Sequence, residues 1–145
     1  MDYVEHAQES GKWAKVAAEH ARKRHSEAAH LHARINHDTR HQKAREAHAC
    51  EEELFDGKWR RQTRLNQYSL SNETAFLLHQ ENLRRNREYH RSANKAHQAI
   101  NHLLWAESAL AKTPPDNIKA AHHRNEALKR RPPRLKCGVE PSDDT

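Results

Sequence analysis

Large apolar side chains, glycine, proline and cysteine are all scarce in this sequence. Leu, Ile, Val and Phe together account for 20 of the 145 residues, and there are only 3 Gly, 5 Pro and 2 Cys. Half-buried β-sandwiches and doubly wound sheets need many β-branched and aromatic residues and frequent turns, so the composition excludes both. No apolar run approaches the roughly 18 residues of a membrane span, and we therefore expect no membrane contact.

Motifs that carry chemistry are scarce as well. The chain has no glycine-rich phosphate loop, its carboxylates are too scattered to define an acid/base pair, and its serines have no base at motif spacing. We therefore predict that the protein is not an enzyme, has no catalytic residue and takes no small-molecule substrate.

The N-terminus carries Asp2 and Glu5 where a signal peptide would be basic. Two isolated cysteines, Cys50 and Cys137, are then expected to be reduced thiols. The predicted location is the cytoplasm or the interior of an intracellular or viral particle.

Alanine, the best helix former, is abundant instead, and every proline lies at or beyond Pro114. We predict an all-α fold: an elongated, coiled-coil-like antiparallel hairpin with long helices over about 2–55 and 72–112. The pair Asp56-Gly57 supplies the turn signal between them. A short third helix is expected over about 115–131, so that residues 1–131 form one helical unit, and residues 132–145 form an extended tail.

Both predicted long helices carry a seam at heptad spacing, which is typical of a face that packs on another helix. Its small residues allow helix axes to approach closely but bury little area each. The seam residues are Ala7, Ala14, Ala18, Ala21, His25, Ala28, His32 and Ile35 on the first helix, and Tyr89, Ala93, Ala96, Ile100 and Leu103 on the second.

Six of the 14 histidines fall into two groups. His25 and His32 lie on the seam, as neutral hydrogen-bonded side chains or as a protonation switch. The second group lies opposite the seam at steps of 7, 4 and 7 and consists of His30, His37, His41 and His48. This placement favours a solvated polar face. His37 and His41, four residues apart, could share one Zn²⁺. No third ligand is placed by the sequence, so we expect no cofactor, with zinc as the alternative.

The formal net charge is +6, and the basic surplus lies between residues 57 and 113. Regularly spaced basic side chains suit contacts with phosphates, although long helices also carry them as solvated surface. The candidates for nucleic-acid contact are Arg60, Arg61, Arg64, Arg84, Arg87, Arg91 and Lys95.

Three functions remain open on the sequence alone. The preferred one is a non-enzymatic structural or adaptor subunit, which is stable within a larger assembly through helix packing with other subunits or with itself. The first alternative is a basic protein that binds the RNA or DNA backbone in a ribonucleoprotein or virion. The second is a histidine-dependent metal-binding protein.

Overall fold

The computed structural model of the chain describes residues 2–35, 39–66 and 71–130, and it confirms the all-α class. These ranges hold four helices and no strand: α1 (Tyr3–Ile35), α2 (Thr39–Asn66), α3 (Asn72–Leu110) and α4 (Asn117–Lys129). Both α3 and α4 begin and end within two residues of the predicted bounds. No helix in the described part of the chain is long and apolar enough to cross a membrane.

The single helix predicted over residues 2–55 is wrong, because α1 ends at Ile35 and α2 begins at Thr39. The helix α2 returns along α1 in the opposite direction. Arg22 on α1 pairs with Glu52 at 3.4 Å, whereas His25, one turn further along α1, faces His48. The first antiparallel pair of the fold is therefore α1 with α2.

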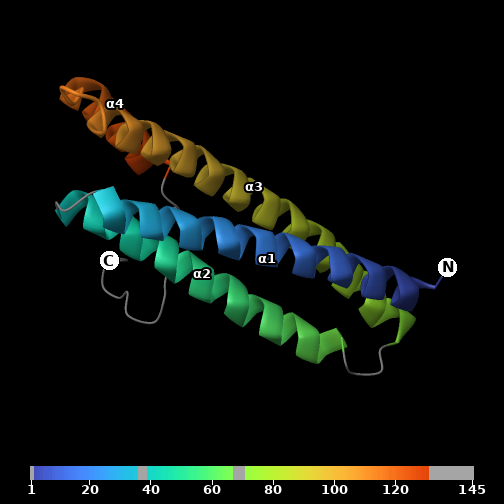
Figure 1. Cartoon of the computed structure of the whole chain (residues 1–145). Coiled ribbons are helices and arrows are strands. Elements are labelled where there is room, and N and C mark those ends of the chain that lie inside the picture. Colours follow the sequence, from blue (N-terminus) through green and yellow to red (C-terminus); the bar gives the residue numbers. More distant parts are fainter. Residues whose placement is uncertain (1, 36–38, 67–70, 131–145) are drawn as a thin grey trace.

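The helix α3 packs on α1 beside α2 and runs parallel to α1. At one end the backbone N–H of Tyr3 donates to Oδ1 of Asn72 at 2.8 Å, and at the other end Nε of Arg34 donates to Oε2 of Glu107 at 2.5 Å. The antiparallel hairpin predicted between the first helix and residues 72–112 is thus a parallel pair. With α2 and α3 both packed on it, α1 is the central helix (Figure 1).

The seam predicted along α1 is buried, and it carries both neighbouring helices. Its residues from Ala7 to His32 are buried, and Ile35 is half-buried against the clusters that contain Leu103 and Ala106. The five predicted seam residues of α3, from Tyr89 to Leu103, are buried as well. The periodicity therefore identified the packed faces of both helices, although their direction differs from the prediction.

The helix α2 has a seam of its own, at a different phase. Its buried residues lie at steps of 3, 4, 3 and 4, and they are His41, Ala44, His48, Glu51 and Phe55. The α1 seam, extended at the same spacing, would instead pass through Thr39, Gln42 and Glu46. Of these residues, Gln42 and Glu46 are exposed, because α2 buries a different face from the one that would continue the α1 seam.

The contact between α1 and α3 includes a buried amide. Asn82, fully buried on α3, donates through Nδ2 to the carbonyl oxygen of Ala7 at 3.1 Å and to Oγ of Ser10 at 3.2 Å. A buried amide needs such partners, because leaving them unmade costs about 1–3 kcal/mol. These bonds fix the register of α3 on α1 where the neighbouring side chains are mostly alanine.

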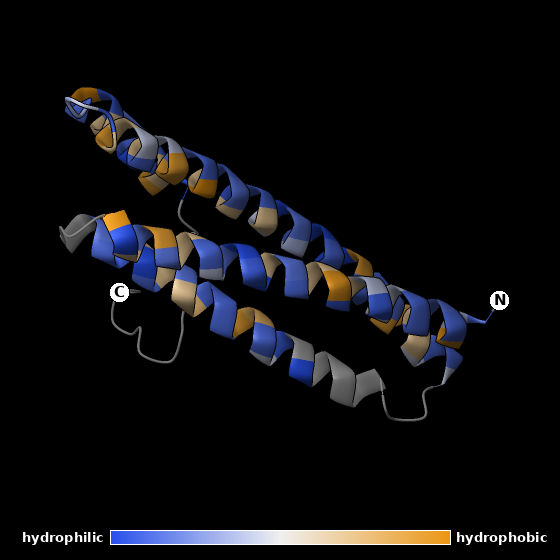
Figure 2. Cartoon of the chain, viewed as in Figure 1, coloured by the Kyte–Doolittle hydropathy of each residue, from blue (hydrophilic) through white to orange (hydrophobic). Residues whose placement is uncertain are grey.

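Several large apolar side chains remain on the outside of this bundle, where Figure 2 shows apolar residues scattered among hydrophilic ones. Trp13 and Val16, one turn apart on α1, are 59% and 55% exposed. Leu77, Trp105 and Ile118 are also exposed. The described helices thus leave large side chains uncovered while burying mainly alanine.

Asp56-Gly57 is no turn, because both residues lie inside α2. Gly57 is exposed, and a Cβ added there would meet no atom within 4 Å. We expect Gly57→Ala to raise the free energy of unfolding by about 0.5–1 kcal/mol, since alanine loses less backbone freedom in a helix than glycine. Urea unfolding followed by circular dichroism measures this change. The control is Ala49→Gly at an exposed position of α2, which should lower the free energy of unfolding by a similar amount. An unchanged or lower free energy of unfolding for Gly57→Ala would contradict the helical assignment of this residue.

Two further predictions concern the cysteines and the tail. Cys50 is disulfide-bonded, so the expectation of reduced thiols is wrong for this residue. Cys137 and the predicted tail of residues 132–145 lie outside the described residues.

Candidate functional site

Four histidines stack in a column between α1 and α2. They alternate between the two helices in the order His41, His32, His48 and His25, with successive ring centroids 6.0, 5.6 and 5.0 Å apart. The rings of Phe55 and Tyr89 continue the same line. Phe55 lies 5.7 Å from His25, and Tyr89 lies 5.2 Å from Phe55. We call the four imidazoles the histidine column.

The spacing of the histidines builds the column. His25 and His32 are seven residues apart on α1, and His41 and His48 are seven apart on α2. Residues seven apart share a face of a helix, so two antiparallel helices interleave the four rings. Each of them is at most 1% exposed.

The burial of His41 and His48 corrects the prediction of a solvated polar face. That prediction assumed one continuous helix, in which these residues lie opposite the α1 seam. Once α2 folds back, the same face turns toward α1. His30, by contrast, is exposed as predicted, with Nδ1 2.7 Å from the carbonyl oxygen of Ser26.

A chain of hydrogen bonds leads from the column to both neighbouring helices. Nδ1 of His48 lies 2.7 Å from Nδ1 of His25, and Nε2 of His25 lies 2.8 Å from Oγ of Ser92 on α3. The Ser92 hydroxyl donates to Oε1 of Glu51 at 3.0 Å. Because Glu51 belongs to α2, the chain starts and ends on that helix and ties all three long helices together.

The direction of these bonds fixes the tautomers. The single hydroxyl proton of Ser92 goes to Glu51, so Ser92 must accept from Nε2–H of His25. Nδ1 of His25 is then unprotonated and accepts from Nδ1–H of His48. The lone pair left on Nε2 of His48 meets no hydrogen-bond partner among the described residues.

The surroundings keep His25, His32 and His48 uncharged at neutral pH. Burial lowers the pKa of His25 to about 4, and burial together with His41 and Arg45 lowers that of His32 to about 4. Burial and the neighbouring histidines His25 and His32 lower the pKa of His48 to about 2. Burial raises the pKa of Glu51, and its hydrogen bond from Ser92 opposes that shift. Protonating any of these histidines therefore works against the fold.

The contact between Ser92 and His25 resembles a nucleophile paired with a base, and sequence reasoning missed it because the two residues are 67 positions apart. Acyl transfer also needs backbone N–H donors directed at an oxyanion. Ser92 lies deep inside α3, where the backbone N–H groups are engaged in the helix. The hydroxyl itself already donates to Glu51. The geometry therefore suits a hydrogen-bond link between helices better than a reaction centre.

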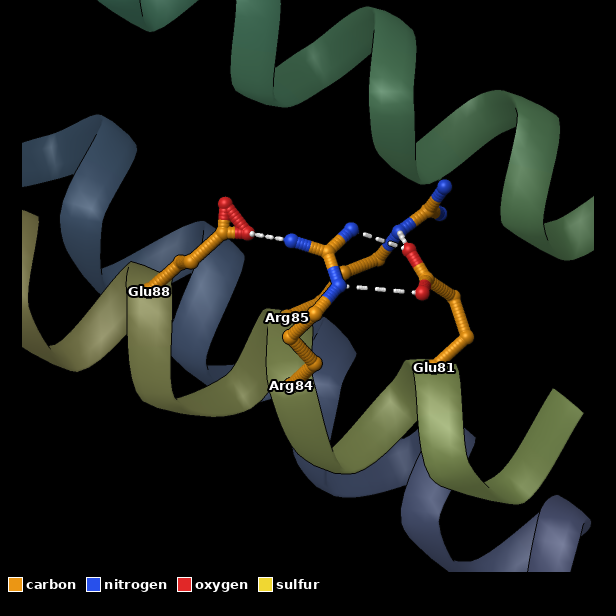
Figure 3. Close-up of polar contacts among 4 residues, drawn as sticks. All are labelled: Glu81, Arg84, Arg85 and Glu88. Atoms are coloured by element: carbon orange, nitrogen blue, oxygen red, sulfur yellow. Dashed lines mark hydrogen bonds and ion pairs between the residues drawn. The ribbon is translucent and has the colours of Figure 1, made fainter. Parts of the chain in front are cut away.

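The basic stripe predicted on the second long helix lies on α3. Arg84 is held by Glu81 and Glu88, and Glu81 also accepts from Arg85 at 3.0 Å (Figure 3). The other members, Arg87, Arg91 and Lys95, are exposed and form no ion pair within the described residues.

On α2, Arg60 is exposed and pairs with Asp56 at 2.7 Å. Arg61 and Arg64 fall on the same helix, but their side chains lie outside the described residues. Of the predicted phosphate-binding residues, three on α3 are therefore both exposed and without an acidic partner in the described structure.

Only one member of the predicted zinc pair lies within the described residues. His41 is a member of the buried column, and His37 lies outside the described residues. No group of three or more His, Cys, Asp or Glu able to hold a metal ion occurs within residues 2–35, 39–66 and 71–130.

No protein-family model, curated protein or solved structure matches this chain. Its function is therefore argued from the geometry alone.

Proposed function

We propose that the protein is a non-enzymatic helical subunit of a larger macromolecular assembly, which it joins through helix packing with other subunits or with further copies of itself. The observation that carries the proposal is the exposed pair Trp13 and Val16 on the central helix. Both neighbours of α1 use its seam, which leaves this outward face for a partner. Large exposed aromatic side chains are typical anchors of protein interfaces.

The composition of the core supports the same proposal. The central cluster consists of four α1 alanines, Phe55, Tyr89 and Ala93, and the large fully apolar side chains buried elsewhere are Leu31, Ile100 and Leu103. Burying a methyl group gives much less free energy than burying a leucine or phenylalanine side chain. A bundle with this core gains substantially when a partner covers its exposed tryptophan and valine.

The test is association through the α1 face. We expect the purified chain to self-associate, or to co-purify with a defined partner from its native source at low salt. Trp13→Gln with Val16→Gln should weaken this association about 30-fold or more, which corresponds to about 2 kcal/mol for an interface anchor. Analytical ultracentrifugation over a concentration series, or titration with the co-purified partner, measures the change.

Leu77→Gln provides the matched control, because Leu77 is 63% exposed but lies on α3. It should leave the association unchanged. A chain that stays monomeric at high concentration and has no partner, or a double variant that associates normally, would remove the basis of the proposal.

The predicted location belongs to this proposal. Disulfides persist at virion surfaces and in other oxidising settings and are rare in the cytosol. Disulfide-bonded Cys50 therefore favours a virion or another oxidising setting over the reducing cytoplasm.

Nucleic-acid binding is the second candidate function. It is favoured by Arg87, Arg91 and Lys95, which lie along one exposed side of α3 without an ion-pair partner in the described structure. Such side chains can contact successive phosphates, and their contribution falls steeply as salt concentration rises.

A further inference from the structure

A hollow of about 280 Å³ lies where α4 folds back on α3. The two helices are antiparallel, because Arg130 Nε donates to Gln98 Oε1 and the alanines nearer the turn, Ala109 and Ala120, share one buried cluster. The hollow is lined by Trp105, Ser108, Ala109, Lys112, Lys119 and His123. It lies far along the bundle from the face that carries Trp13.

An aromatic side chain forms one wall of the hollow. Trp105 is 51% exposed, and two histidine rings hold it in place. The ring of His102 meets the indole edge-on, with ring centroids 5.1 Å apart. The ring of His123 has its centroid 5.3 Å from that of the indole, and the two ring planes are inclined at 52°. Nδ1 of His102 is 3.0 Å from Nδ1 of His123, which joins α3 to α4 behind the indole. A large, oriented aromatic surface is therefore presented at the mouth of the hollow.

The charge at the hollow is positive. Lys112 and Lys119 make no ion pair or side-chain hydrogen bond within the described residues. Several carboxylates of this region have partners of their own. Asp116 caps α4 by accepting from the backbone N–H of Lys119, Glu107 pairs with Arg34, and Glu126 pairs with Lys129 and Arg130. The two ammonium groups that line the hollow beside the indole thus have no ion-pair partner within the described residues.

The charges decide between a cation and an anion as the ligand. Facing imidazoles could in principle hold a metal ion, but only two converge here. Burial and Arg130 lower the pKa of His102, and burial, His122 and Lys119 lower that of His123. The same positive neighbours that disfavour a proton also disfavour a divalent cation. An anion is the ligand that these surroundings favour.

We propose that this hollow binds one nucleotide unit, with the base stacked on Trp105 and the phosphate held by Lys112 and Lys119. Stacking on an aromatic side chain accepts any base, and lysine binds phosphate as a point charge. The volume of about 280 Å³ lies just below the range for small-ligand sites, which begins at about 300 Å³, so the hollow suits no more than a single unit. The unit comes from a free nucleotide or from a single-stranded nucleic acid. This site is independent of the α1 face assigned to assembly.

The test uses the full-length chain and two probes. Calorimetry with 5′-AMP measures the free nucleotide, and fluorescence anisotropy of a labelled twelve-nucleotide oligo-dT measures the strand. We expect binding of at least one probe. Binding of 5′-AMP with no tighter binding of the oligonucleotide identifies the free nucleotide as the source, and binding of the oligonucleotide at least tenfold tighter identifies a strand.

Two variants separate the stacking wall from the phosphate contacts. Trp105→Leu should weaken binding about tenfold, within the range observed when an aromatic side chain stacked on a base is removed, whereas Trp105→Phe should retain most of the affinity. Lys112→Gln with Lys119→Gln should also weaken binding and lower the slope of log K against log salt by one to two. Circular dichroism confirms that each variant remains helical.

Matched controls come from α1. Lys12→Gln with Lys23→Gln removes the same charge from exposed α1 positions, and Trp13→Gln with Val16→Gln removes a tryptophan; both should bind the probes normally. Trp105→Leu should in turn leave the proposed self-association unchanged, so the two proposals fail separately. No binding of either probe at millimolar concentration would overturn the site. So would unaltered binding by Trp105→Leu, or inorganic phosphate or a phosphopeptide binding as tightly as 5′-AMP.

Discussion

Acidification from pH 7.5 to pH 5 should remove several kcal/mol from the free energy of unfolding, and three buried histidines together set an upper bound of about 6 kcal/mol. The pKa values of His25 and His32 are lowered to about 4 and that of His48 to about 2, whereas histidine in the unfolded chain titrates near 6.5. As pH falls below 6.5, the unfolded chain takes up protons that the folded chain refuses. Below pH 6.5, each histidine therefore lowers the free energy of unfolding by about 1.4 kcal/mol for every further pH unit. At pH 5 the loss per histidine is about 2 kcal/mol.

The sign of the effect follows from the direction of the shifts. Stability is full above pH 6.5 and declines as pH drops toward 4. Glu51 acts in the opposite sense, because its raised pKa lets the folded chain take up a proton more readily than the unfolded chain. Other charged groups also act on these side chains. Arg45 lies near His32, and Lys58 and Glu88 act on the Glu51 carboxyl. Small domains have only about 5–15 kcal/mol of stability, so the loss should unfold much of the population.

Urea unfolding at half-unit steps of pH measures this loss. His32→Leu should reduce the slope of the free energy of unfolding against pH by about 1.4 kcal/mol per pH unit between pH 6.5 and 5. The reason is that one of the three histidines that bind a proton only in the unfolded chain has been removed. His30→Gln is the control, because His30 is exposed, and it should keep the full dependence. A stability that stays flat from pH 7.5 to 5 would show that the column is not buried.

Phe55→Ala should cost about 3–5 kcal/mol and release α2 from the bundle. Phe55 is 3% exposed and shares a cluster with Ala14, Ala18 and Tyr89, so it is the large apolar side chain through which α2 contacts both other long helices. Truncating a buried phenylalanine removes its apolar burial and leaves a cavity. Alanine neighbours cannot extend side chains to fill it.

Urea unfolding gives the size of this loss, and hydrogen exchange gives its location. Backbone amides of α2 should exchange faster than those of α1 and α3, because the α1–α3 contact keeps its own core residues. Phe76→Ala is the control: Phe76 is 37% exposed and touches Tyr3 edge-on at 4.8 Å, so its truncation should cost about 1 kcal/mol or less. Equal losses for the two variants, or uniform exchange, would contradict the linking role of Phe55.

The parts of the fold that follow from local periodicity could be read from the sequence. The seams of α1 and α3 have a clear heptad spacing, and α3 and α4 are capped by acceptor side chains of the usual type, Ser71 and Asp116. The chain reversal after Ile35 was missed because neither glycine nor proline marks it. The signal that could have found it is the change of seam phase, from the α1 line to the one through His41, Ala44 and His48.

The histidine column could be predicted only in part. The seam placed His25 and His32 inside, and the neutral, hydrogen-bonded form proposed for them is the one that His25 adopts. The partners could not be read, because they depend on which helix returns along α1 and in which direction. Ser92 and Glu51 come together only in three dimensions, 41 positions apart, and no spacing rule connects them.

The parallel pairing of α1 and α3 sets an order of events during synthesis. Every hydrogen bond between these helices joins residues 67 to 75 positions apart. Translation at roughly 5–20 residues per second therefore leaves α1 without α3 for several seconds. Part of that time is spent in making α2, which is the first helix able to pack on the α1 seam, so the four imidazoles can stack before Ser92 exists. Until α3 is made, the part of the seam that α3 covers stays open to a chaperone or an assembly partner.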